Sequence, residues 1–294
     1  MNNSKQKRKF GDRKDARRCR DVQGTNQILI DLKPKCYMAE LHINQKIDVT
    51  NVMKYLKKNN NSEEHITFFH AVSLAIGKTI YNRPLLNRFI SNRHTYEHND
   101  VSLSFVAKID FTDASEEMMV VMPILEDDNI HTYSKRLGDK VKSIRNKSDK
   151  KEGANDIVDV LAKLPNIIRV PVIGLLKSMD KHGWLPSSIM KDNLYYSSMV
   201  LSNLGTLKCG SIYHNVTEFG TCPGLITIGE IKEEEVVVNG KKEIKQFCEF
   251  GMTIDERIGD GFYFIKSIKL LEHILNNPKL LEGRADEKIE VEIK

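Results

Sequence analysis

Apolar and polar side chains alternate at several places along the chain, which predicts β-strands. The first such run spans residues 37–44, and its alternating apolar positions are Tyr37, Ala39, Leu41 and Ile43. A period of two is typical of a strand with one buried face. Further strand-like runs occupy residues 86–90, 101–109, 118–124, 195–201, 225–231, 234–238 and 245–254. The pair Asn239-Gly240 predicts a hairpin turn between the last two.

Other segments have a helical period instead. Within residues 64–80, one face collects the apolar side chains Ile66, Phe69, Val72, Ile76 and Ile80. Similar patterns cover residues 52–56, 133–144 and 262–281. Either Asp48 or Thr50 can cap the first of these helices. Strands that alternate with helices, with a hairpin late in the chain, favour a single α/β domain in which helices cover a mixed sheet.

Residues 156–190 have a helical composition that prolines and glycines interrupt. Their apolar run Ile167–Leu176 is too short to span a bilayer, which needs about 20 apolar residues. We expect this run to form a buried helix or a lid, and a segment lying on a membrane surface is the alternative. Residues 146–155, which precede this region, are charged and contain Gly153, so we expect a loop there.

The composition is that of a soluble globular protein. Of the 294 residues 40% are hydrophobic, and the mean hydropathy is −0.40. The net charge of +5 is concentrated in residues 1–21, which hold nine Lys or Arg and three Asp, whereas the remainder holds 36 basic and 37 acidic residues. We expect residues 1–24 to form a solvated basic arm, residues 25–283 the folded domain, and residues 284–294 a polar tail. Because the body has no basic surplus, we expect no nucleic-acid partner.

The cysteines indicate a reducing compartment. There are five, an odd number, and none forms a C-x-x-C pair. We therefore expect free thiols in a cytoplasmic protein, with neither a disulfide framework nor a zinc site. No apolar segment follows the basic N-terminal residues, and no run reaches the length of a membrane span, so we expect no secretory signal and no membrane contact.

Charged residues are concentrated at one predicted strand-to-helix turn, residues 253–261. Asp260 is placed to cap the following helix, and Gly261 permits a tight backbone. Charged side chains packed between two apolar elements are also where pKa values shift at functional sites. The turn is therefore either a capped helix start or the corner of a site.

Several short motifs in a fixed order carry a family resemblance. They are Asp48–Thr50, Pro84–Asn87, Val121–Ile124, Ser202–Gly205, Gly224–Ile231, Glu235–Gly240, Asp255–Gly261 and Asn277–Leu281. In this order they resemble the catalytic domain of the 2-oxo acid dehydrogenase dihydrolipoyl acyltransferases and chloramphenicol acetyltransferase. The resemblance covers roughly residues 25–283 and implies the chloramphenicol acetyltransferase-like fold.

The resemblance also implies an active site. In that family a motif His removes a proton from an acceptor that attacks an acyl thioester of coenzyme A, in a channel between subunits of a trimer. A Ser or Thr hydroxyl stabilises the oxyanion, and the motif Asp holds the local structure through an Arg. Carried over, Ser202 is the oxyanion serine, with a polar strand end as the alternative, and Asp260 is the motif Asp. The candidates for the arginine are Arg13, Arg17, Arg18 and Arg20.

The general base falls on Glu256, where the family has His. An ordinary Glu has a pKa of ~4.3 and a thiol ~8.5, so proton transfer is uphill by roughly 5–6 kcal/mol. Deep burial can raise a carboxyl pKa by about 3–5 units and close this gap. If Glu256 instead pairs with a cation, we expect it to be a structural anchor. His214, in a segment that lines the family's channel, is a substitute base or a chance histidine.

We therefore expect a stand-alone acyltransferase that uses coenzyme A thioesters and forms a homotrimer. A lipoyl domain, a subunit-binding domain and an Ala/Pro linker are not found in the sequence, which argues against a role as the core of a dehydrogenase complex. The alternative is a non-catalytic trimer that binds coenzyme A or serves as a scaffold, because a fold can persist after its chemistry is lost.

Overall fold

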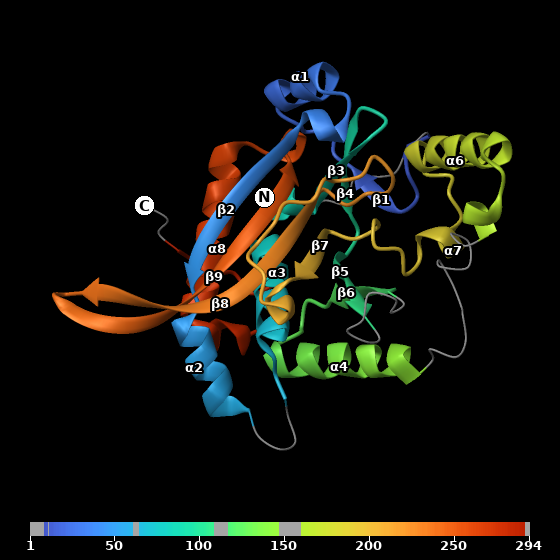
Figure 1. Ribbon diagram of the computed structural model, residues 1–294. Coiled ribbons are helices and arrows are strands. Elements are labelled where there is room, and N and C mark those ends of the chain that lie inside the picture. The colour runs from blue at the N-terminus through green and yellow to red at the C-terminus, as the bar shows by residue number, and fades with distance from the viewer. Residues whose placement is uncertain (1–8, 11, 61–64, 109–116, 147–159, 292–294) are drawn as a thin grey trace.

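The computed structural model describes residues 9–10, 12–60, 65–108, 117–146 and 160–291. Its main element is a six-stranded sheet with the order β2-β9-β8-β7-β5-β6 (Figure 1). The strands are β2 (Glu40–Asp48), β5 (Val101–Lys108), β6 (Glu117–Ile124), β7 (Met199–Asn203), β8 (Gly224–Val238) and β9 (Lys241–Asp255). The β5–β7 and β7–β8 pairs are parallel and the others are antiparallel. The predicted mixed sheet is confirmed.

Four helices pack with this sheet to form the main hydrophobic core. They are α2 (Thr50–Asn59), α3 (Phe68–Asn82), α4 (Ile130–Asn146) and α8 (Gly261–Asn276). Leu74 of α3, Phe250 of β9 and Phe264 of α8 are completely buried in that core. The periodic apolar face predicted for residues 64–80 explains why α3 lies at its centre, although residues 61–64 lie outside the described part.

The β8–β9 hairpin turns at Asn239 and Gly240, as the sequence predicts. Both residues have positive φ, 50° and 77°, which the twist of a two-residue hairpin requires and which Asn and Gly tolerate best. The two runs predicted at 225–231 and 234–238 form one continuous strand, with a register shift between Ile228 and Ile231. The predicted break at residues 232–233 is therefore absent, and the irregularity lies earlier, inside the first run.

A second, three-stranded sheet has the order β1-β4-β3. It contains β1 (Ala16–Arg18), β3 (Arg88–Ser91) and β4 (His94–His98). The expectation of a solvated arm is wrong for residues 12–20, because Arg13 is only 1% exposed and pairs with Asp15 and Asp180. Acidic partners, one of them far along the chain, neutralise this arginine and allow its burial.

The remaining helices are α1 (Gly24–Leu32), α6 (Asn166–Lys181) and α7 (Ser187–Met190). Short 3₁₀ turns occupy Cys36–Met38, Pro84–Asn87, Gly205–Leu207, Glu256–Ile258 and Pro278–Leu281. Among the described residues, no helix combines the length and the apolar character needed to cross a membrane. The loop predicted at 146–155 lies outside the described residues, apart from Asn146.

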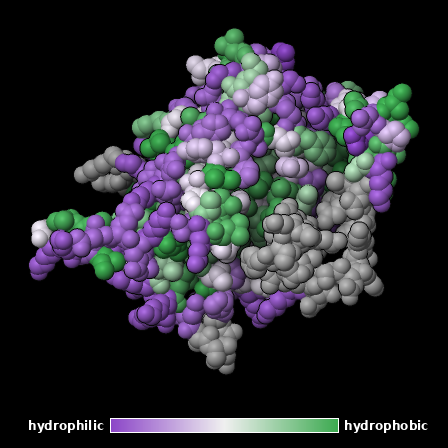
Figure 2. All heavy atoms as spheres, in the orientation of Figure 1, coloured by the Kyte–Doolittle hydropathy of each residue, from purple (hydrophilic) through white to green (hydrophobic). Residues whose placement is uncertain are grey.

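For Ile167–Leu176 we expected a buried helix or a lid, and the expectation of burial is wrong. These residues form the middle of α6, yet Ile167, Val170 and Leu175 are 83%, 65% and 61% exposed. In Figure 2, hydrophobic residues reach the surface at the right, where α6 lies. The run has apolar residues around the whole helix circumference, and only one side of α6 packs on the domain. Asp180, near its end, is the buried residue of this helix.

Candidate active site

The turn between β9 and α8 is fixed by an ion pair within the turn itself. Arg257 donates two hydrogen bonds to the Asp255 carboxylate, at 2.8 and 2.6 Å, and a third to the Lys33 carbonyl. Both side chains are buried. Burial alone would lower the pKa of Arg257, but the hydrogen bonds and charge of Asp255 outweigh it and raise that pKa. The pair therefore holds the backbone on which Glu256 is placed.

Asp260 caps α8, as the sequence predicts. Its Oδ1 accepts a hydrogen bond from the backbone N–H of Tyr263 at 2.7 Å, and the residue is exposed. Among the described residues, the four arginine candidates pair elsewhere. Arg13 binds Asp15 and Asp180, Arg17 binds Glu97, and Arg18 and Arg20 share Asp12. The structure therefore gives Asp260 a helix-capping contact and gives these arginines other partners.

Glu256 forms an ion pair with Lys33, the C-cap residue that follows α1. Its backbone N–H donates to the carbonyl of Ala39 at 2.9 Å. The Glu256 side chain is 30% exposed, so water reaches it. Within a single copy, Glu256 therefore lacks the desolvation that would make its carboxylate a strong base. The ion pair with Lys33 is the kind of contact that we expect of a structural anchor.

Ser202 and Glu256 lie far apart in one chain. Ser202 is on β7 and pairs with Thr227 of β8. Asp255, at the end of β9, donates its N–H to the carbonyl of Pro223, four residues before Thr227. At about 3.3 Å per residue and about 4.8 Å per strand, the Ser202 and Glu256 backbones are about 16 Å apart. These two residues do not form one site within a single copy.

His214 lies in the segment that follows β7, residues 208–223. This segment contacts the sheet at two points: Ile212 exchanges hydrogen bonds with Thr227, and Val216 donates its N–H to the Glu40 carboxylate at 2.8 Å. His214 itself is exposed. The segment therefore passes from β8 to β2 over the face that also carries Ser202.

A histidine that the motifs did not indicate lies under this segment. His42 Nδ1 is 3.1 Å from the Thr253 hydroxyl, and its Nε2 is 3.8 Å from the Glu40 carboxylate. The ring also contacts Tyr213, with centroids 5.2 Å apart. The strand register places His42 and Ser202 on the same sheet face. The one signal in the sequence was the position of His42 on the polar side of the alternating 37–44 run.

Four of the five thiols are buried, and that of Cys209 is exposed. All five cysteines are free. Burial raises the pKa of Cys222 to about 11 and that of Cys248 to about 12, so both stay protonated at neutral pH. Burial and the neighbouring Asp255 carboxylate also raise the pKa of Cys36. Among the described residues, no group of three or more His, Cys, Asp or Glu could hold a metal ion.

A family model matches part of the chain. The model for the catalytic domain of the 2-oxoacid dehydrogenases acyltransferase matches residues 187–282. This span contains Ser202, His214, Glu256 and Asp260. A search of the curated proteins finds no match.

Solved structures confirm the fold. A probable dihydrolipoamide acetyltransferase from Listeria monocytogenes 4b F2365 aligns with a TM-score of 0.58 and 11% identity over 87% of this chain and 93% of that chain. The dihydrolipoamide acetyltransferase of Azotobacter vinelandii, studied for a serine, a histidine and an asparagine in its catalytic mechanism, gives 0.58 and 11% over 87% and 88%. A chloramphenicol acetyltransferase gives 0.56 and 12% over 88% and 99%. The chain has the chloramphenicol acetyltransferase-like fold.

Proposed function

We propose that this chain is an acyltransferase that takes its acyl group from a coenzyme A thioester and works as a homotrimer. The observation that carries the proposal is the separation of Ser202 from the Glu256 turn. Both belong to the family-matched span, yet one chain holds them about 16 Å apart. A site that needs both must be completed by a second copy. The similarity to the cubic core of a pyruvate dehydrogenase complex (TM-score 0.56, 12% identity) supports assembly of this kind.

The proposed reaction is acyl transfer to a thiol, hydroxyl or amine. A base on one copy removes the acceptor proton while the acceptor attacks the thioester carbonyl. The Ser202 hydroxyl of the adjacent copy donates a hydrogen bond to the tetrahedral oxyanion. The intermediate then collapses, the carbon–sulfur bond breaks, and coenzyme A leaves as its thiol after it accepts the proton from the base. The new ester, thioester or amide is the product.

Three side chains are candidates for the base. Glu256 occupies the motif position but is paired with Lys33 and partly solvated. His214 is exposed. His42 is held by Thr253 and lies on the sheet face of Ser202. An ordinary imidazole is about 2 pKa units below a thiol, half the gap of an ordinary carboxylate, so it requires less help from its surroundings. His42 is therefore tested beside Glu256 and His214.

The test is acyl transfer by purified protein from acetyl-CoA and longer acyl-CoA donors to a panel of dithiol, alcohol and amine acceptors. Loss of the oxyanion donor in Ser202→Ala should lower kcat by roughly 10²–10³-fold. One of Glu256→Gln, His42→Gln and His214→Ala should have a comparable effect, and the exposed control His131→Gln should have none. Full activity in Ser202→Ala and in all three base variants would remove these assignments.

The second candidate function is a non-catalytic trimer that binds coenzyme A or a partner protein. The ion pair between Glu256 and Lys33 favours it, because it occupies the carboxylate at the position of the base. A rise in melting temperature with coenzyme A, without turnover on any donor, would support it. Absence of coenzyme A binding would count against the acyltransferase and against the coenzyme A-binding form of this trimer. The five free cysteines support a cytoplasmic location for either one.

A further inference from the structure

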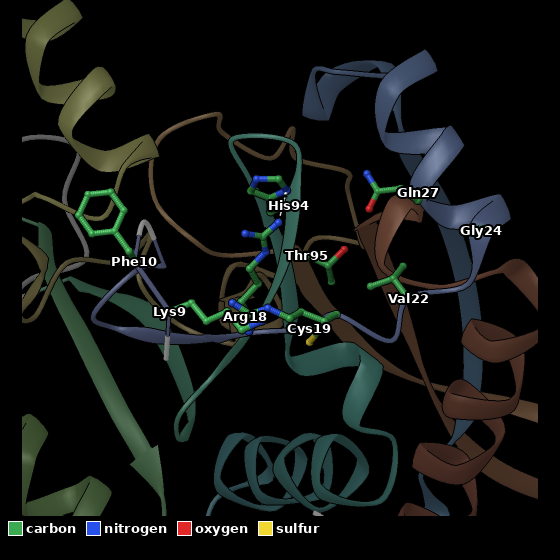
Figure 3. Close-up of a pocket in the computed structure, with 10 residues that line it drawn as sticks. Lys9, Phe10, Arg18, Cys19, Val22, Gly24, Gln27, His94 and Thr95 are labelled. Carbon is green, nitrogen blue, oxygen red and sulfur yellow. Dashed lines mark hydrogen bonds between the residues drawn. The ribbon is translucent and has the colours of Figure 1, made fainter. Parts of the chain in front are cut away.

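A polar pocket of about 470 Å³ lies at the start of α1, at the opposite end of that helix from the Lys33–Glu256 pair (Figure 3). It is lined by Lys9, Phe10, Arg18, Cys19, Arg20, Val22, Gly24, Gln27, His94 and Thr95. The pocket is thus formed by the chain around β1, by β4 and by the first turn of α1. None of these residues belongs to the site described above.

Thr95 has a buried hydroxyl without a partner. The residue is 3% exposed, and no described group forms a hydrogen bond with its Oγ1. Figure 3 shows this hydroxyl pointing toward the side of the pocket where Val22 and Gln27 lie. A buried hydroxyl that lacks a hydrogen bond costs free energy. A ligand oxygen in the pocket would supply the missing partner.

The charges around the pocket favour an anion. Arg20 contacts Asp12 at 2.5 Å, and Arg18 contacts the same carboxylate at 3.5 Å. With Lys9, three cations therefore face one carboxylate. Arg18 also donates a hydrogen bond to His94 Nδ1 at 3.0 Å, which leaves the Nε2 of that imidazole as an N–H donor. Burial and the charge of Arg18 lower the pKa of His94, so it is a neutral donor at pH 7.

The first turn of α1 adds a further attraction for negative charge. Gln23, the residue before the helix, makes no side-chain cap, and the first turn has no acidic residue. A Cβ added at Gly24, which lines the pocket, would meet no atom within 4 Å, so the space beside this residue is open. Uncapped N–H groups and the positive end of the helix dipole bind phosphate groups in many proteins.

We propose that this pocket binds a phosphate group of a small-molecule ligand. The hydroxyl of Thr95, the guanidinium groups of Arg18 and Arg20, and the start of α1 would hold the phosphate oxygens. The volume exceeds that of a phosphate ion, so the phosphate belongs to a larger molecule. The nine residues of α1 place the pocket about 14 Å from the Glu256 turn. The phosphate can thus come from the proposed coenzyme A donor or from a separate phosphorylated compound.

The test is calorimetric titration of the whole protein in low-salt buffer with pyrophosphate and, separately, with coenzyme A. We expect saturable binding that weakens as ionic strength rises. Thr95→Val replaces the hydroxyl by a methyl group of similar size and should weaken binding roughly tenfold. In the same variant, resistance to urea should be unchanged or higher, because an unpartnered buried group is removed. A purely structural threonine would show no loss of binding.

Gln27→Glu is the second variant. A carboxylate in the first turn should repel the phosphate, so binding should be lost. Its attraction to the positive end of the helix dipole should offset the loss of the weak hydrogen bond from Gln27 to the Arg93 carbonyl, so the melting temperature should be kept. The charge-matched control Lys135→Gln, at an exposed position of α4, should bind like the original protein.

The outcomes separate this proposal from the proposed function. Binding of pyrophosphate that both variants weaken supports the pocket even if no acyl transfer is found. If coenzyme A binds as well as pyrophosphate, and both variants weaken its binding, the phosphate comes from the coenzyme A donor. Absence of binding by either probe at millimolar concentration overturns the pocket. So does binding that is equal in all variants, whether or not the protein is an acyltransferase.

Discussion

Arg257 and Asp255 form a buried pair whose partners depend on each other. Arg257→Leu would leave the Asp255 carboxylate buried without a cation, and we expect the free energy of unfolding to fall by about 3–5 kcal/mol. Urea denaturation measures this change. Lys33→Gln, which breaks the more exposed pair with Glu256, is the comparison and should cost about 1 kcal/mol or less. Equal effects of the two substitutions would contradict the anchoring role of Arg257.

His98 predicts a pH dependence of stability. Its Nδ1 donates to the Asn87 carbonyl and its Nε2 accepts from Thr221, and burial lowers its pKa to about 4. The unfolded chain therefore binds the proton more tightly, and stability falls as the pH drops from about 6.5 to about 4. The loss from this group is up to about 3 kcal/mol.

Urea denaturation at pH 7 and pH 5 checks this expectation. His98→Gln should reduce the difference in unfolding free energy between the two pH values, whereas the exposed His182→Gln should leave it unchanged. His70, whose pKa burial also lowers to about 4, contributes in the same direction, so part of the slope should remain in His98→Gln. A slope that His98→Gln does not alter would contradict the role given to His98.

At the scale of elements, α6 is attached by one side only. We expect Ile167→Ser and Leu175→Ser to change the free energy of unfolding by less than about 0.5 kcal/mol, because both side chains are exposed. Phe264→Ala, in the buried core, should cost about 3–5 kcal/mol. Thermal and urea unfolding of the three variants check the difference. A large loss in the α6 variants would show that another element or another copy covers this helix.

The elements that the sequence predicted are those whose pattern reports burial directly. The alternation in β2 and the pair Asn239-Gly240 led to the right strands and turn because both signals are local. β1 and β4 were missed because their residues are mostly polar. The burial of Arg13, which precedes β1, was missed because it depends on a distant partner, Asp180. For α6, the apolar run gave the helix but not its exposure, since tertiary packing alone decides which side is covered.

The candidate site likewise has a part that the sequence predicts and a part that it does not. The cap formed by Asp260 follows from a position before a helix, which the sequence shows. The Lys33 partner of Glu256 and the Thr253 partner of His42 could not be predicted, because each joins segments more than 200 residues apart. Such partners decide whether a side chain like that of Glu256 or His42 can act as a base or serves as a structural anchor. Motif order therefore led to the fold, whereas the chemistry of the turn depends on contacts made only in three dimensions.

At the scale of the whole molecule, a site shared between copies has a consequence that a site within one copy lacks. Consider Ser202→Ala and the inactive base variant, each purified as an inactive trimer. In a mixed trimer, a site is intact when its serine comes from a base-variant copy and its base from a Ser202→Ala copy. Random mixing at equal amounts makes about one site in four intact, by the geometry of cyclic assemblies.

Co-expression or joint refolding of the two variants should therefore restore about a quarter of the original activity. Light scattering should show a trimer for each variant and for the mixture. The matched control joins Ser202→Ala with a double variant that carries both substitutions, which leaves no intact site and should stay inactive. Failure of the mixture to regain activity, with trimers that demonstrably exchange, would place the serine and the base in the same copy and overturn the shared site.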